Sequence, residues 1–132
     1  MLGATYRFTA YNSTGQTLAA NAITIKPRRW KYGTDGSLTD EATGAADVLA
    51  QTATLANAAY KNGNTIDNTV NKYIGGFFEI IVTAPASSNG NVAINCERSV
   101  DGGTTWPDNG KGEWVFTFNF TAAGTQREVV EL

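Results

Sequence analysis

Apolar and polar side chains alternate along much of the chain, and this period of two predicts β-strands. The clearest alternation is in residues 113–120, where four aromatic side chains face one way. Residues 4–11, 18–26 and 91–98 alternate in the same manner, and we expect Pro27 to end the second of these strands because it has no N–H to donate. The side chains predicted to face inward are Tyr6, Phe8, Ala10, Ile23, Ile25, Val92, Ile94, Cys96, Trp114, Phe116, Phe118 and Phe120.

The most hydrophobic run of the chain is residues 75–85, between a glycine pair and Pro85. It is rich in aromatic and β-branched residues and is too short for a typical helix. This combination predicts a strand that is buried on both faces. Residues 45–60 fit two patterns, because Leu49, Ala53, Ala56 and Tyr60 have helical spacing, whereas Ala56, Ala58 and Tyr60 alternate as in a strand. Threonine, asparagine and glycine lower the helix propensity there. We favour strands there and keep a short helix as the alternative.

About eight strands at short spacing, with turn residues between them, predict an all-β protein. The expected architecture is an antiparallel β-sandwich of the jelly-roll type. A chain of 132 residues is long enough for one core, so we expect residues 1–132 to form a single domain. Residues 1–44 are interpreted as N-terminal strands and an exposed loop that could form a contact arm toward other subunits. Asn62-Gly63 predicts a hairpin turn.

Composition excludes several classes of site. The chain has no histidine and one cysteine, Cys96, so the usual zinc sites and histidine-based triads are excluded. A net charge of -2 gives no basic excess for nucleic acid, and no apolar run is long enough to span a membrane. The N-terminus lacks the layout of a signal peptide, so we expect assembly in the cytoplasm. The loop aspartates lack the spacing of an EF-hand, and we expect no metal or other cofactor.

Two carboxylates and one thiol are the candidates for catalysis. Glu79 and Glu97 fall in predicted strands, on faces expected to be solvated, and a glycosidase needs such a pair about 5–9 Å apart. A sandwich of this size has little room for a deep cleft, so we expect no enzyme activity. Cys96 has no histidine to act as its base, and we expect it to be a small core residue.

A basic and aromatic cluster, Arg28, Arg29, Trp30 and Tyr32, begins a segment of residues 28–47 that we expect to be a long exposed loop. These side chains could cap one end of the core. They could also contact a neighbouring subunit, because Trp, Tyr and Arg are enriched at interface anchors.

Four aromatic residues could instead form a stacking platform for a sugar. They are Trp30, Tyr32, Tyr73 and Trp106. Packing in the core or at its rim is the simpler role for them.

Residues 99–106 match the Asp-box pattern Ser-x-Asp-x-Gly-x-Thr-Trp. Ser99 and Asp101 are expected to accept hydrogen bonds from turn N–H groups, and Gly103 to supply an unusual backbone angle. Trp106 is expected to tuck under the turn. The motif resembles the Asp boxes of sialidases, where it lies away from the active site. We therefore expect a structural turn.

Two segments together carry a resemblance to a known class of protein. One is Thr65-Ile66-Asp67-Asn68-Thr69-Val70-Asn71-Lys72-Tyr73, which runs into Phe78-Glu79-Ile80-Ile81-Val82; the other is Glu97-Arg98-Ser99-Val100-Asp101-Gly102-Gly103-Thr104-Thr105-Trp106-Pro107-Asp108. Their order resembles that in small virion structural proteins of tailed bacteriophages.

The resemblance implies a non-enzymatic, homo-oligomeric jelly-roll subunit, assembled in the host cytoplasm and located on the virion. Capsid decoration or cement is the preferred role, with major capsid or tail proteins as partners. The expected contact elements are the N-terminal strand and the loop at residues 28–35. The alternative is a protein of the tail or baseplate, including a carbohydrate-binding module for host adhesion.

Overall fold

The computed structural model describes residues 2–107 and 112–132, so that Asp108, the last residue of the segments that carry the resemblance, lies outside it. The described residues form strands and no helix. The strands are β1 (Thr5–Ser13), β2 (Ile23–Tyr32), β3 (Leu38–Asp40), β4 (Leu49–Ala50), β5 (Ala59–Asn62), β6 (Ile66–Asp67), β7 (Gly75–Ala84), β8 (Gly90–Ser99), β9 (Glu113–Phe120) and β10 (Gly124–Glu131).

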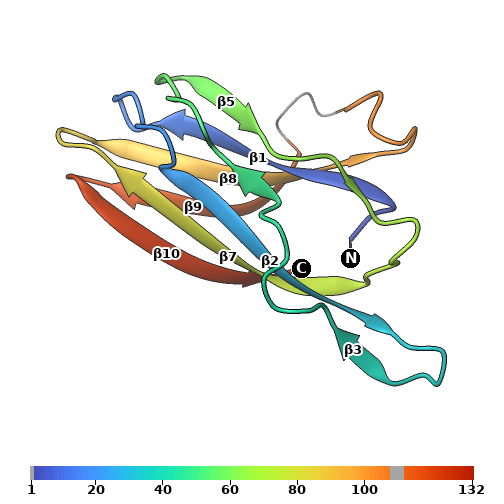
Figure 1. Ribbon diagram of the computed structural model, residues 1–132. Helices are drawn as coiled ribbons and strands as arrows, with labels where there is room; N and C mark the ends of the chain where they lie inside the picture. The colour runs from blue at the N-terminus through green and yellow to red at the C-terminus, as the bar shows by residue number, and fades with distance from the viewer. Residues whose placement is uncertain (1, 108–111) are drawn as a thin grey trace.

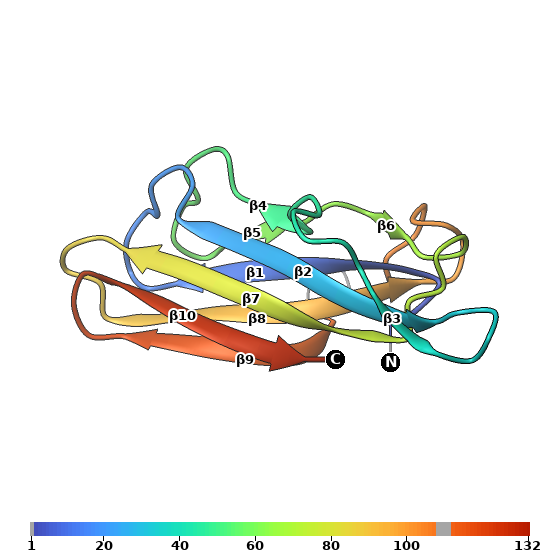
Figure 2. The same ribbon diagram turned by 60° about the horizontal axis from the view of Figure 1, so that its bottom comes forward.

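Two antiparallel sheets pack face to face (Figures 1 and 2). The first sheet has the order β5-β1-β8-β9, with β6 also paired to β1. The second has the order β10-β7-β2-β3, with β4 also paired to β2. The predicted antiparallel β-sandwich is therefore confirmed. Ten strands are described where about eight were expected, because β4 and β6 are short two-residue pairings.

A hydrophobic core lies between the sheets, and about half of its buried side chains are ones that alternation placed inward. Phe8 of the first sheet packs against Phe78 of the second, with ring centroids 4.8 Å apart. Each large apolar side chain that is fully buried contributes roughly 1.5–3 kcal/mol relative to an exposed one. The period of two thus predicted the core well in β1, β2 and β8.

The alternation in β9 is interrupted by a β-bulge. Phe116 pairs with Ile94 and Trp114 with Asn95, so the register shifts by one residue between them. The shift turns Trp114 onto the outer face, where it is 63% exposed. Its predicted inward position was wrong, because an extra residue in a strand reverses the faces beyond it.

The prediction that residues 75–85 are buried on both faces was also wrong. In β7, Phe78, Ile80 and Val82 are fully buried, whereas Phe77 on the opposite face is 47% exposed. Hydrophobic composition predicted the strand but not the number of its buried faces, because that depends on whether another layer covers the sheet.

Strand β2 continues through Pro27 to Tyr32, so the loop expected at residues 28–47 is largely absent. The carbonyls of Ile25 and Arg29 both accept hydrogen bonds from the side of β3 and β4. The nitrogen of Pro27 faces the same side, in the interval between the residues that pair with β4 and those that pair with β3. A strand tolerates proline where no ladder bond is needed.

The N-terminal region is built into the sheets and does not form a free arm. β1 lies between β8 and the two short strands β5 and β6, and β2 lies between β7 and β3. The hairpin β2–β3 extends beyond the body of the sandwich (Figure 1). We therefore expect any contact that residues 1–44 make with another subunit to involve that hairpin.

Residues 45–67 follow the edges of both sheets as short strands, and the helical alternative is not found. Asn62-Gly63 does not make the predicted hairpin, because β5 and β6 both pair with β1. Gly63 donates its N–H to the Phe8 carbonyl, and a Cβ there would lie 2.6 Å from the Val48 carbonyl oxygen. The glycine is required by this close approach.

Candidate functional site

The hairpin β2–β3 separates the predicted interaction residues into two sets. Because side chains alternate along β2, Arg28, Trp30 and Tyr32 lie on its outer face, and Arg29 lies on the other. Trp30 packs edge-on against Phe77 of β7, with centroids 5.2 Å apart. Of the four candidate contact residues, three therefore share one surface and Arg29 does not.

Arg29 joins the two sheets at one end of the core. Its Nε donates to Glu41 Oε2 at 2.8 Å and its Nη2 to Glu41 Oε1, which makes a two-pronged ion pair. Its Nη1 donates to the Tyr6 hydroxyl of the first sheet at 2.9 Å. Both charged side chains are about one-tenth exposed, at 12% for Arg29 and 9% for Glu41. Tyr73 covers this guanidinium, with its ring centroid 4.7 Å from Cζ.

The environment of Arg29 shifts two pKa values. Burial alone would lower the pKa of the guanidinium, but the hydrogen bonds with Glu41 and Tyr6 outweigh it and hold the pKa above its ordinary value. Burial raises the pKa of the Tyr6 phenol, and Arg29 opposes this effect. Arg29 therefore stays charged as part of the end of the core, and little of its side chain is exposed.

Beside Arg28, Trp30 and Tyr32, the outer face of the second sheet carries exposed apolar side chains from neighbouring strands. Tyr32 is 64% exposed, Leu38 59%, Phe77 47% and Val129 54%. We call Trp30, Tyr32, Leu38, Phe77 and Val129 the outer patch. A groove of about 410 Å³ borders it, lined by residues that include Arg28, Phe77 and Val129.

The Asp-box segment forms the predicted turn. Ser99 Oγ lies 2.7 Å from Asp101 Oδ1 and accepts the Gly103 N–H at 2.9 Å. The Thr105 N–H donates to Asp101 Oδ1 at 2.8 Å. Gly103 has a φ of 93° and lies against Trp106. These bonds hold the pKa of the Asp101 carboxyl at about 2, chiefly through Thr105 and then Ser99.

Trp106 reaches from this turn onto the first sheet and covers an ion pair there. Arg7 Cζ lies 4.1 Å from the Trp106 ring centroid. Arg7 Nε donates to Glu97 Oε2 at 2.6 Å, and the Glu97 side chain is fully buried. The expectation that Glu97 faces solvent was wrong. Its position on the outer side of β8 is correct, but Arg7 and Gly112 lie against it, and Trp106 in turn lies over Arg7.

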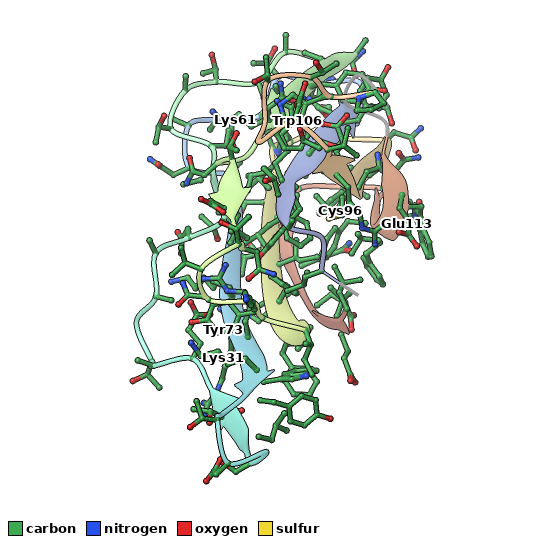
Figure 3. The ribbon with its side chains drawn as sticks, turned by 90° about the vertical axis from the view of Figure 1, so that its right-hand side faces the viewer. Lys31, Lys61, Tyr73, Cys96, Trp106 and Glu113 are labelled. Carbon is green, nitrogen blue, oxygen red and sulfur yellow. The ribbon has the colours of Figure 1, made fainter. Side chains whose placement is uncertain are left out.

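Figure 3 shows these two arginine sites from one end of the sandwich. Lys31 and Tyr73 lie together on one side, and Trp106 lies on the other. The Tyr73 ring is near both Arg29 and Lys31, and the Trp106 ring is near Arg7. The four aromatic residues proposed as a sugar platform are therefore not brought together: only Trp30 and Tyr32 share a surface.

The candidate residues for catalysis are placed apart. Glu79 lies in β7 of the second sheet and Glu97 in β8 of the first, so the two carboxylates do not face one another. Cys96 is buried in the core, and burial raises the pKa of its thiol to about 11. Its position matches the predicted core role.

Across residues 2–107 and 112–132, no group of three or more histidine, cysteine, aspartate or glutamate side chains is placed to hold a metal ion. The same residues include no helix long and apolar enough to cross a membrane. No family model, curated protein or solved structure matches this chain.

Sequence reasoning missed the partners that make the arginines structural. Arg7 and Glu97 are directly opposite in the register of β1 and β8, but they are far apart in the chain. Glu41 follows a hairpin that the sequence did not predict. Thr5, Thr9 and Asn12 of β1 are also buried, so β1 is covered on more than its apolar face. Alternation alone did not predict this cover.

Proposed function

We propose that this chain is a non-enzymatic structural subunit of a tailed-bacteriophage virion, and that it decorates the capsid. The observation that supports the proposal most is the outer patch, which leaves Tyr32, Leu38 and Phe77 substantially exposed on the outer face of the second sheet and its hairpin. Apolar side chains gathered on an exposed face are typical of sites that bind another protein. The bacteriophage assignment itself rests on the resemblance of residues 65–82 and 97–108.

In this role the subunit binds through the face of the second sheet and the hairpin β2–β3. Trp30, Tyr32 and Arg28 are the residue types that dominate binding energy at interfaces. A stable interface buries more than about 1,000 Å² in total. The patch supplies apolar anchors, and the exposed ion pair between Arg28 and Asp40 supplies a polar rim. Contacts that span joints between capsid subunits would stabilise the particle against internal pressure.

The test is binding of the purified chain to particles that lack it. Tyr32→Ala combined with Phe77→Ser should weaken the affinity for the particle by about 100-fold or more, because each such anchor contributes about 2 kcal/mol or more when truncated. Val70→Ser is the matched control, since Val70 is 82% exposed outside the patch. A reconstruction that places the chain only on the tail would reject the decoration role and favour the tail or baseplate alternative.

A carbohydrate-binding module is the rival from a different class. It requires aromatic faces open to a sugar, and Tyr73 and Trp106 have cations against their rings. Glycan-array binding that disappears in Trp30→Ala and Tyr32→Ala would support it over a protein partner.

A further inference from the structure

The long edge of the second sheet is formed by β10, an unbroken strand without a second neighbour among the described residues. It pairs with β7 over residues 124–131 in continuous register. The other sheet edges differ. β5, β6, β3 and β4 are each four residues or fewer, and β9 has the bulge next to Trp114. Short or bulged edges are ways in which proteins avoid pairing with other chains. In the part of the chain that the structure describes, β10 lacks these protections.

The backbone groups that β10 presents at this edge can be assigned. Leu132 and Gly76 exchange both of their backbone hydrogen bonds, which fixes the phase of the ladder with β7. In an antiparallel ladder such pairs recur at every second residue, so the even-numbered residues of β10 face β7. Thr125, Arg127, Val129 and Glu131 therefore direct their N–H and C=O groups away from the sheet. Strand β9 is the edge of the first sheet and β10 is the edge of the second, and these two edges lie along the same side of the sandwich (Figures 1 and 2).

We propose that β10 pairs with β10 of a second copy of this chain, antiparallel about a twofold axis at Val129. In that register, Arg127 of each copy lies opposite Glu131 of the other copy. This pair therefore occurs twice, once on either side of the two opposed valines. Glu128 faces Val130, and Gln126 faces Leu132. The result is one continuous sheet across two copies.

Charge selects this register over its neighbours. Each side chain must stay on its own face of the sheet, so the alternative registers are those in which the twofold axis moves to Glu128 or to Val130. The first sets Glu128 opposite Glu128 of the other copy. The second leaves Arg127 without Glu131 opposite it. Opposite charges that face each other across strands are favourable, and like charges are unfavourable. Arg127 already lies 3.6 Å from Glu79, with 63% of its side chain exposed, so its other nitrogens remain able to meet a carboxylate.

This inference goes beyond the proposed function, because it concerns a second copy and needs no particle. Dimers would place two outer patches on the same face of one sheet, since Val129 belongs to both the patch and the edge. Its failure would leave the capsid role untouched, and failure of particle binding would leave the dimer untouched.

The first experiment measures the mass of the full chain in solution by analytical ultracentrifugation over a range of concentrations. Val129→Pro removes only an N–H that points away from β7, so the fold should survive while dimerisation is lost. Val129→Ala, which keeps the N–H, is the control for the side chain. Circular dichroism checks that both variants fold. A wild-type monomer at every concentration, or a dimer that Val129→Pro leaves intact, would overturn the inference.

The second experiment tests the charges. Glu131→Arg should weaken the dimer about tenfold or more, because it places arginine against arginine at two positions. Adding Arg127→Glu should recover much of that loss. Asp40→Arg makes the same charge change on β3, at the opposite edge of the second sheet, where Asp40 is 54% exposed, and should leave the dimer unchanged. Equal effects of Glu131→Arg and Asp40→Arg would contradict the pairing.

The third experiment measures the register. The two Cα atoms of a directly opposed, hydrogen-bonded pair are about 5.5 Å apart, within the range of a disulfide. Val129→Cys should therefore crosslink under mild oxidation, whereas Arg127→Cys should not. The native Cys96 is buried and should not react. Crosslinking of Arg127→Cys in preference to Val129→Cys would rule out the proposed register.

Discussion

Two arginine–glutamate pairs, each with an aromatic ring over the guanidinium, stabilise different parts of this molecule. The Arg7–Glu97 pair joins neighbouring strands of one sheet and lies under Trp106. The Arg29–Glu41 pair closes the end of the core and reaches the other sheet through Tyr6. The first therefore fixes a loop onto a sheet, and the second fixes the sheets to one another. Location, more than chemistry, decides what an ion pair stabilises.

The largest effect should come from breaking the pair that joins the sheets. Glu41→Gln leaves Arg29 with an uncompensated charge in a largely buried site, and we expect a loss of about 3–5 kcal/mol in the free energy of unfolding. Urea denaturation measures it. Asp40→Asn, in the exposed pair with Arg28, is the control and should cost less than about 1 kcal/mol. Equal losses would show that burial of Arg29 has no energetic consequence.

The Asp-box turn, which carries Trp106 over the Arg7–Glu97 pair, can be strained at the backbone of Gly103. Gly103→Ala should cost about 1–3 kcal/mol, because a side chain disfavours a positive φ. It would also place a Cβ 2.7 Å from Thr65 Cγ2. A Cβ at Gly124 would meet no atom within 4 Å, and Gly124 has no positive φ, so Gly124→Ala should change little. Thermal unfolding compares the two, and a larger loss for Gly124→Ala would contradict the assignment of strain.

The two aromatic rings that lie over the guanidinium groups, those of Trp106 and Tyr73, can be compared directly. We expect Trp106→Leu to cost about 1–2 kcal/mol and Tyr73→Leu about half as much, because tryptophan is the stronger cation–π partner. The Trp106 ring is also closer to its guanidinium, at 4.1 Å against 4.7 Å. Added salt should not remove either effect, since both arginines are largely shielded. A reversed order in urea denaturation would show that ring packing, not the cation, dominates.

The smallest expected effect is the change in stability when the Asp101 carboxyl of the turn is protonated. The pKa of Asp101 is lowered to about 2 in the folded chain. Its ordinary value in an unfolded chain is about 3.9. The contribution of the ionised carboxylate is thus fully present above about pH 4 and is lost as the pH falls through about 2. Carboxyl NMR should show a midpoint near 2, and Ser99→Ala should raise it. An unchanged midpoint in that variant would contradict the Ser99 contribution.

The sequence predicted most of the fold because the inward residues of β1, β2 and β8 follow a period of two. It also predicted the Asp-box turn, which is a local structure. It failed where distant segments decide the outcome. The bulge that exposes Trp114 depends on pairing with β8, and the buried Glu97 has its ion-pair partner, Arg7, on a distant strand. The continuation of β2 through Pro27 depends on the interval between two partner strands.

The pairing of β1 with β8 has a consequence for folding. Arg7 and Glu97 are 90 residues apart in the chain, and Tyr6, Phe8 and Ala10 of β1 belong to the core. During synthesis, β1 therefore remains without its main neighbour until most of the chain has left the ribosome. Contacts between such distant segments slow folding and prolong the exposure of apolar surface. We expect this protein to fold after translation, on a timescale of milliseconds to seconds.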